Sequence, residues 1–209
     1  NISIGVYYDV DSLQVLEQWD EIEATPGTYV WNLTDDRGNP WGIDNQLSDI
    51  KTRAGNKINQ SKFIRLTVRA GGQLGGKRMP DWVVDGVESS TTGEDDKVVR
   101  WDPQYTCRFW QLVKASGAKY EPDPAIVVVS MQAASKTGEM TMTKPFLDSI
   151  RVLGYRDSDI ARNMKWLYRN SLQVYTEAVP TKSITMNMGQ IPVTDPDAGS
   201  EVTYSILDD

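Results

Sequence analysis

Histidine is absent from this chain of 209 residues, and cysteine occurs only once. Without histidine, catalysis by a Ser-His-Asp or Cys-His arrangement is excluded, and so is a zinc site built on imidazoles. Acid–base chemistry must therefore use carboxylates, Lys or Tyr. Cys107 has no second cysteine to pair with, so an internal disulfide is excluded as well. We expect Cys107 to be a small buried residue of a helix.

Long apolar runs and an excess of basic residues are also missing. No stretch reaches the roughly 18 apolar residues that a membrane-spanning helix needs. The 29 acidic residues outnumber the 22 basic ones and leave a net charge of −7, which argues against a nucleic-acid partner because phosphates require clustered Lys and Arg. The acidic residues 94–96 are interpreted as a solvated turn rather than a calcium site. We expect no metal, no cofactor and no membrane span.

The chain starts at Asn1 rather than at Met, which fits removal of a signal peptide and fits an incomplete chain equally well. Asn1, Asn32 and Asn59 each begin an Asn-X-Ser/Thr acceptor pattern, which matters only in a eukaryotic secretory pathway. The expected location is extracellular or periplasmic.

Apolar patterning divides the chain into alternating strands and helices. Dense β-branched or alternating segments predict strands over residues 2–10, 62–72, 125–131 and 183–189. Helical spacing is loose over residues 9–24 and clear over 43–55, around 109–113 and over 159–179. Residues 31–40 are interpreted as loop, and residues 73–100 as a long loop around a short MPDWVV element.

This alternation predicts an α/β protein of the (β/α) TIM-barrel type. A closed barrel needs eight strands, whereas four are predicted here. We therefore expect residues 1–209 to form a single barrel-type domain that is truncated at its C-terminus and incomplete within this chain. Another chain could complete the barrel, because half a barrel leaves open sheet edges that invite pairing.

Candidate site residues follow the ends of the predicted strands, where a (β/α) barrel carries its chemistry. Glu139 lies in the loop after the strand that ends at residue 131. Arg69, Gln132 and Asn187 stand near strand ends and could hydrogen-bond sugar hydroxyls, or could instead satisfy loop carbonyls. Trp82, in the long loop, could stack on a sugar ring.

Other side chains receive a structural interpretation. Trp110 stands at helical spacing and is expected to pack in the core. Asp20 and Glu23 are expected to be exposed acids of a helix or loop rather than catalytic groups. For Glu139 the alternative to catalysis is a solvated loop acid.

Several motifs in a fixed order carry a family resemblance. QWDEIEATPGTYVWN is similar to a W-x-x-x-E-P-x-x-G-x-Y-x-W/F segment, and MPDWVV, WDPQY, KYEPDPAIVVVSMQ and GEM follow it. In this order they resemble the N-terminal part of a retaining (β/α)8-barrel glycoside hydrolase of the β-galactosidase-like kind. The chain departs from the pattern where Ala24-Thr25-Pro26 replaces a Glu-Pro pair and where Gly138, not Asn, precedes Glu139.

The resemblance implies a glycosidase that acts on a β-linked glycoside with two carboxylates, in which Glu139 is the acid/base. The family's nucleophile comes from a later strand, so a second carboxylate would have to be supplied from elsewhere. The alternative is a non-catalytic carbohydrate-binding or structural surface protein on a partial barrel. In both cases the expected ligand is a carbohydrate.

Overall fold

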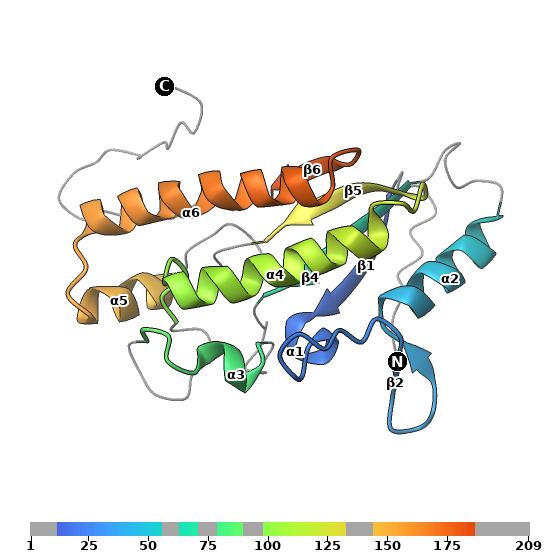
Figure 1. Cartoon of the computed structure of the whole chain (residues 1–209), viewed down its shortest axis with the longest axis horizontal. Coiled ribbons are helices and arrows are strands. Elements are labelled where there is room, and N and C mark those ends of the chain that lie inside the picture. The colour runs from blue at the N-terminus through green and yellow to red at the C-terminus, as the bar shows by residue number, and fades with distance from the viewer. Residues whose placement is uncertain (1–11, 56–62, 71–78, 90–97, 133–143, 187–209) are drawn as a thin grey trace.

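The computed structural model describes residues 12–55, 63–70, 79–89, 98–132 and 144–186 (Figure 1). Its centre is a four-stranded sheet in the order β1 (Ser12–Gln18), β4 (Phe63–Arg69), β5 (Ile126–Met131) and β6 (Ser183–Met186). All neighbouring strands are parallel. Helices α4 (Pro103–Tyr120) and α6 (Asp157–Ala178) lie side by side over one face of this sheet (Figure 1). The predicted α/β class with a parallel sheet is confirmed.

Strand β1 corrects the interpretation of residues 9–24 as loosely helical. Seven residues pair in register with β4, from Ser12 opposite Phe63 to Gln18 opposite Arg69. Helix begins only afterwards, as the single turn α1 (Trp19–Ile22). Pairing along a full strand satisfies the backbone polar groups of this segment, which outweighs its weak helical spacing. The strand predicted over residues 2–10 lies outside the described residues.

The helix predicted after residue 43 is confirmed as α2 (Ile43–Ala54), with its apolar stripe of Ile43, Leu47 and Ile50 buried. Helix α4 is also confirmed. Asp102 caps it, because its Oδ1 accepts a hydrogen bond of 2.7 Å from the backbone N–H of Gln104, and Pro103 occupies the first turn. MPDWVV holds the short helix α3 (Asp81–Val84).

Two expectations about local structure were wrong, and one helix was not predicted. Residues 31–40, expected to be loop, contain most of a two-stranded hairpin, β2 (Leu33–Thr34) and β3 (Pro40–Trp41). Asp35 stabilises its turn by accepting hydrogen bonds from the backbone N–H groups of Arg37 and Asn39. Helix α5 (Lys144–Val152) was not predicted. Cys107 is exposed, because it stands on the outward side of α4 while Thr106 and Phe109 face the core.

The two faces of the sheet differ in chemistry. Leu66 of β4 and Val129 of β5 lie against α4 and α6, where they line a small apolar cavity. On the other face, Gln14 Nε2 donates to Thr67 Oγ1 at 3.1 Å, and the Ser130 hydroxyl lies 3.3 Å from that of Thr185. The helix-covered face is therefore apolar, and the opposite face, which would line a barrel interior, is polar.

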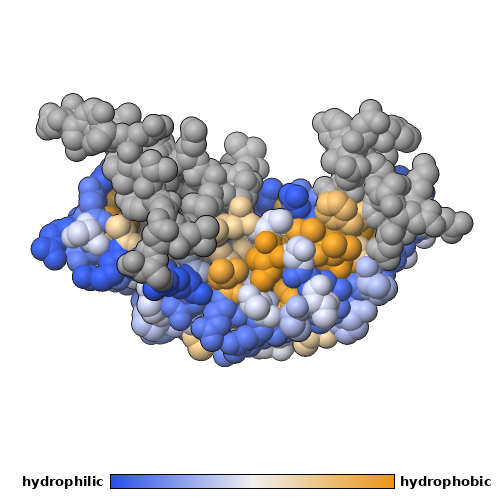
Figure 2. Space-filling view, turned by 90° about the horizontal axis from the view of Figure 1, so that it is seen from above, coloured by the Kyte–Doolittle hydropathy of each residue, from blue (hydrophilic) through white to orange (hydrophobic). Residues whose placement is uncertain are grey.

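Seen from above, the described residues present a patch of apolar side chains above a hydrophilic lower edge (Figure 2). The described chain also exposes a few large apolar side chains, among them Val127 of β5, which is 39% exposed, and Leu172 of α6, which is 46% exposed.

Candidate functional site

The carboxyl ends of all four parallel strands point to one edge of the sheet. Arg69 is the last residue of β4 and is paired with Gln18 at the end of β1. Gln132 directly follows β5. The structure thus brings the ends of neighbouring strands to one edge, as the sequence predicted for Arg69 and Gln132, and their role in binding stays a prediction.

Gln132 is fixed at this edge by Tyr175 of α6. Its backbone N–H donates to the Tyr175 hydroxyl oxygen at 3.2 Å, and that hydroxyl lies 3.5 Å from the Gln132 carbonyl oxygen, to which it can donate. The Gln132 side chain is only 4% exposed, and its Oε1 accepts no hydrogen bond from any described residue. A buried amide oxygen needs a donor, and none of the described residues supplies one to Gln132.

Arg100 is a further residue of this edge that the sequence analysis missed. Its side chain is 1% exposed, and Nη1 donates to the carbonyl of Ala70, just past β4, at 3.3 Å and to the Tyr105 hydroxyl at 2.9 Å. The guanidinium carbon lies 5.0 Å from the centre of the Tyr105 ring. Burial raises the pKa of Tyr105, while the positive charge of Arg100 opposes that rise. In the sequence, the hint that Arg100 is buried was its position between the apolar residues Val99 and Trp101, at the end of a segment interpreted as loop.

Trp82 is half-buried, and its contacts in the described chain hold it in place. The indole Nε1 donates to the Glu23 carbonyl at 3.0 Å, and its ring meets Trp19 edge to face at 6.1 Å. The Arg108 guanidinium lies 5.9 Å from the ring centre. Stacking of Trp82 on a sugar stays a prediction, and these contacts show how the ring would be held.

Glu23 corrects the expectation of an exposed acid. It is 1% exposed, and its carboxylate accepts hydrogen bonds of 2.8 Å from both Trp19 Nε1 and the backbone N–H of Gly27. Burial raises the pKa of Glu23, and these two donors limit the rise. Glu23 therefore fastens the turn after α1. Asp20 is half-buried.

A pair of carboxyl groups does occur near the end of β1, although it is not arranged for catalysis. Glu17 is 1% exposed and shares a hydrogen bond with Glu21. Burial and the neighbouring Glu21 raise the pKa of Glu17 to about 9. Gln46 of α2 donates to Glu17 Oε2 at 3.3 Å, so this carboxyl lies under a helix and out of reach of a substrate.

Glu139 and Asn187, the remaining predicted site residues, lie outside the described residues. Within the described ranges, no group of three or more acidic, Cys or His side chains is placed to hold a metal ion. No helix of the described chain is long and apolar enough to cross a membrane.

The arrangement of parallel strands was compared with solved protein structures. The chain is similar to an exo-β-1,4-mannosidase, Op5Man5, from Opitutaceae bacterium strain TAV5, at 13% identity and a TM-score of 0.51 over 86% of this chain and 26% of that one. The α/β fold with its parallel sheet matches part of a TIM barrel of the kind found in this enzyme. No family model and no curated protein matches the sequence.

Two further solved structures are similar to this TIM-barrel segment at lower TM-scores. Endo-glycoceramidase II from Rhodococcus sp. is 12% identical, with a TM-score of 0.47 over 92% of this chain and 47% of that one. GH5_18 from Streptomyces cattleya is 10% identical, with a TM-score of 0.49 over 86% and 36%. The chain spans about a quarter to a half of the chains to which it is similar.

Proposed function

We propose that this chain forms part of a glycosidase that hydrolyses a β-linked glycoside by retention, with Glu139 as the acid/base. The observation that carries the proposal is the edge where the parallel strands end, at which Gln132 is buried and fixed by Tyr175. Glu139 follows Gln132 by seven residues in the sequence. Carboxylates placed after strand ends serve as the acid/base of retaining glycosidases, and the TIM-barrel fold supports this assignment.

In the proposed mechanism the protonated Glu139 carboxyl donates its proton to the leaving glycosidic oxygen while a second carboxylate attacks the anomeric carbon. Glu139, now ionised, then removes a proton from the water that hydrolyses the glycosyl-enzyme intermediate. The second carboxylate must lie about 5–5.5 Å from Glu139. We assign it to a strand beyond those described, from this polypeptide or from another chain that completes the barrel.

Substrate binding is assigned to the residues at the same edge. Gln132 Oε1 would accept a hydrogen bond from a sugar hydroxyl, and Arg69 and Asn187 would donate to others. Trp82 would present part of its ring to the apolar face of a sugar. Arg100 is a positioning residue, because it holds the end of β4 through the Ala70 carbonyl.

Glu139→Gln tests the catalytic assignment in the complete polypeptide. With a p-nitrophenyl β-glycoside panel that includes the mannoside, glucoside and galactoside, we expect turnover to fall about 100- to 10,000-fold, because proton transfer is lost. A dinitrophenyl leaving group needs little protonation, so its release should fall much less. Azide should partly restore turnover in Glu139→Ala and yield a glycosyl azide, because it needs no general base. Glu177→Gln, an exposed acid of α6, is the control.

Equal losses with both leaving groups and no azide rescue would refute the acid/base role. A non-catalytic carbohydrate-binding protein is the second candidate, favoured by the hydrogen-bonding side chains of Arg69 and Gln132 at the described part of the edge. Saccharide binding that needs Gln132, without turnover on any glycoside, would establish that candidate instead.

A further inference from the structure

Helices α4 and α6 concentrate positive charge in an acidic protein. The two helices together carry six basic residues and three acidic ones, and the acidic residues Asp157, Asp159 and Glu177 all stand within three residues of the ends of α6. The rest of the chain holds the other 16 basic residues and the other 26 acidic ones. The outward surface of this helix pair therefore differs in sign from the protein as a whole.

Three of these six cations have neither an ion pair nor a side-chain hydrogen bond among the described residues: Lys114 on α4, and Lys165 and Arg169 on α6. All three are exposed. Arg108 has no ion pair with a described residue but donates to the carbonyl oxygens of Val83 and Asp85. Lys165 and Arg169 are one helical turn apart, about 6 Å along the axis, and so face the same side. Their charge is open to an external anion.

Two tryptophans lie beside these cations. The rings of Trp110 on α4 and Trp166 on α6 are 5.8 Å apart and inclined at 40°. Trp166 is 43% exposed, whereas Trp110 is half-buried and its Nε1 donates to Ser171 Oγ at 3.2 Å. Trp110 thus supports Trp166, whose open ring surface suits stacking on a flat, weakly polar ring.

From these observations we propose that the outward face of α4 and α6, defined by Lys114, Lys165, Trp166 and Arg169, binds an acidic polysaccharide. The carboxylates of the polysaccharide would form ion pairs with the three cations, and one of its sugar rings would stack on Trp166. The Asn170 side chain, whose Nδ2 donates to the Trp166 carbonyl at 2.7 Å, keeps its Oδ1 for a sugar hydroxyl. This surface lies over the helices and away from the strand-end edge, so its function is independent of the proposed catalysis.

Charge density favours this partner over other polyanions. Duplex nucleic acid carries a charge about every 1.7 Å and is held by many phosphate contacts, which three unpaired cations on an acidic protein do not supply. A lipid surface requires a broad apolar face that enters the bilayer. On described α6 only Trp166 and Leu172 are exposed large apolar residues, and they are not one turn apart. An acidic polysaccharide needs only spaced charges and one open ring.

Binding of polygalacturonate to the full polypeptide, measured by calorimetry at low salt, tests the proposal. We expect saturable binding that weakens as salt is raised, because the contacts are exposed ion pairs. Lys165→Gln with Arg169→Gln should weaken binding about tenfold or more. Arg37→Gln with Arg53→Gln makes the same charge change elsewhere on the surface and should alter binding less than about twofold.

Trp166 separates stacking from charge. Trp166→Ala should weaken polygalacturonate binding about fivefold or more, and Trp166→Phe should restore most of it because an aromatic face is kept. Turnover of a small aryl glycoside, if the protein has it, should be unchanged in all these variants.

Three results would overturn the proposal: no binding of polygalacturonate, equal binding by the patch variants and the control pair, or binding of anionic phosphatidylglycerol vesicles in place of the polysaccharide. Equal Trp166-dependent binding of a neutral β-glucan would also overturn it, because charge would then have no part. None of these measurements depends on Glu139, so failure here and failure of the glycosidase assignment are distinguishable.

Discussion

Glu17 is a carboxyl group that the fold holds in its neutral form near pH 7. Burial and the hydrogen bond with Glu21 raise its pKa to about 9, whereas in the unfolded chain it returns to about 4.5. The folded state therefore binds a proton that the unfolded state has released over this range. The resulting stability is fully present below about pH 4.5 and is lost as pH rises through about 9.

Glu17→Gln should remove this dependence, because the amide keeps hydrogen-bonding groups and cannot ionise. We expect the variant to be more stable than the parent by about 1–3 kcal/mol at pH 8 and nearly equal to it at pH 4.5. Urea unfolding followed by tryptophan fluorescence at both pH values measures the difference. Glu177→Gln, which is exposed, should show no such trend, and a parallel shift in both variants would contradict the assignment.

Arg100 is a second residue whose burial makes a specific prediction. Arg100→Met keeps much of the side-chain volume but leaves the Ala70 carbonyl and the Tyr105 hydroxyl without this donor. Unfolding free energy should fall by about 2–4 kcal/mol, since buried polar partners lose their hydrogen bonds. Arg53→Met, on the exposed side of α2, should change it by about 0.5 kcal/mol or less. Similar small losses in both would show that Arg100 is not structural.

At the scale of elements, close packing of α4 on α6 depends on Gly117. A Cβ atom at this position would lie 2.3 Å from the Ala178 carbonyl oxygen, which is backbone and cannot rotate away. Gly117→Ala should force the helices apart and cost about 1–3 kcal/mol, despite the better helix propensity of Ala. Thermal unfolding measures this, with Lys114→Ala on the same helix as the control. Unchanged stability would mean that α4 and α6 are not in this contact.

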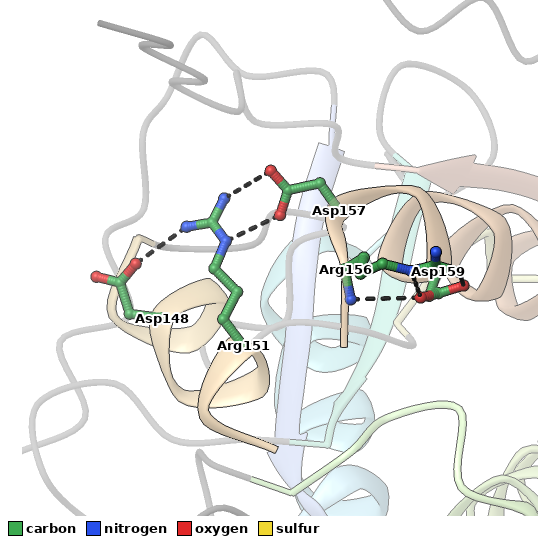
Figure 3. Close-up of polar contacts among 5 residues, drawn as sticks. All are labelled: Asp148, Arg151, Arg156, Asp157 and Asp159. Carbon is green, nitrogen blue, oxygen red and sulfur yellow. Dashed lines mark hydrogen bonds and ion pairs between the residues drawn. The ribbon is translucent and has the colours of Figure 1, made fainter. Parts of the chain in front are cut away.

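The turn between α5 and α6 is held by surface ion pairs (Figure 3). Arg151 contacts Asp157 through Nε at 2.9 Å and Nη2 at 3.2 Å, and Asp148 through Nη1 at 3.0 Å. The hydrogen bond from Arg151 lowers the pKa of Asp157. Because the groups are well exposed, Asp157→Asn should cost no more than about 1 kcal/mol, and 1 M salt should remove most of the difference. A loss that persists in high salt would indicate a role other than ion pairing.

Helices and strands whose apolar residues fit only one periodicity could be predicted from the sequence. A segment whose apolar residues fit both helical and strand periodicity could not. α2, α4 and α6 each carry an apolar stripe at helical spacing, and β4 and β5 carry dense β-branched runs. Residues 12–18 fit both a strand and a helix, and only pairing with β4 decides between them. Arg100 was missed because no local pattern shows that an arginine in a long loop returns to the sheet.

At the scale of the whole molecule, the sheet has an open side at β6. β6 pairs with β5 on one side, and no described strand pairs with its other side. We propose that another chain packs against this edge, because unpaired strand edges and exposed apolar side chains favour association. Light scattering on the 209-residue polypeptide should then give a mass above 23.5 kDa at micromolar concentration.

Ser183→Lys should shift that mass toward 23.5 kDa, since it places a charge on the exposed start of the open strand β6. Gln173→Lys, which adds the same charge at an exposed position of α6, is the control. A mass of 23.5 kDa at every concentration would exclude self-association as the way the barrel is completed.

The sequence by itself determined the α/β alternation, the absence of histidine-based chemistry and the strand ends where candidate side chains stand, because these depend on residue type and local spacing. Only the tertiary structure decided that residues 12–18 are a strand, that Glu17 and Glu23 are buried, and that Arg100 reaches the end of β4. It also showed that Lys165 and Arg169, beside Trp166, form no ion pair with another described residue. Each of these depends on contacts between segments far apart in the chain, which no local pattern contains.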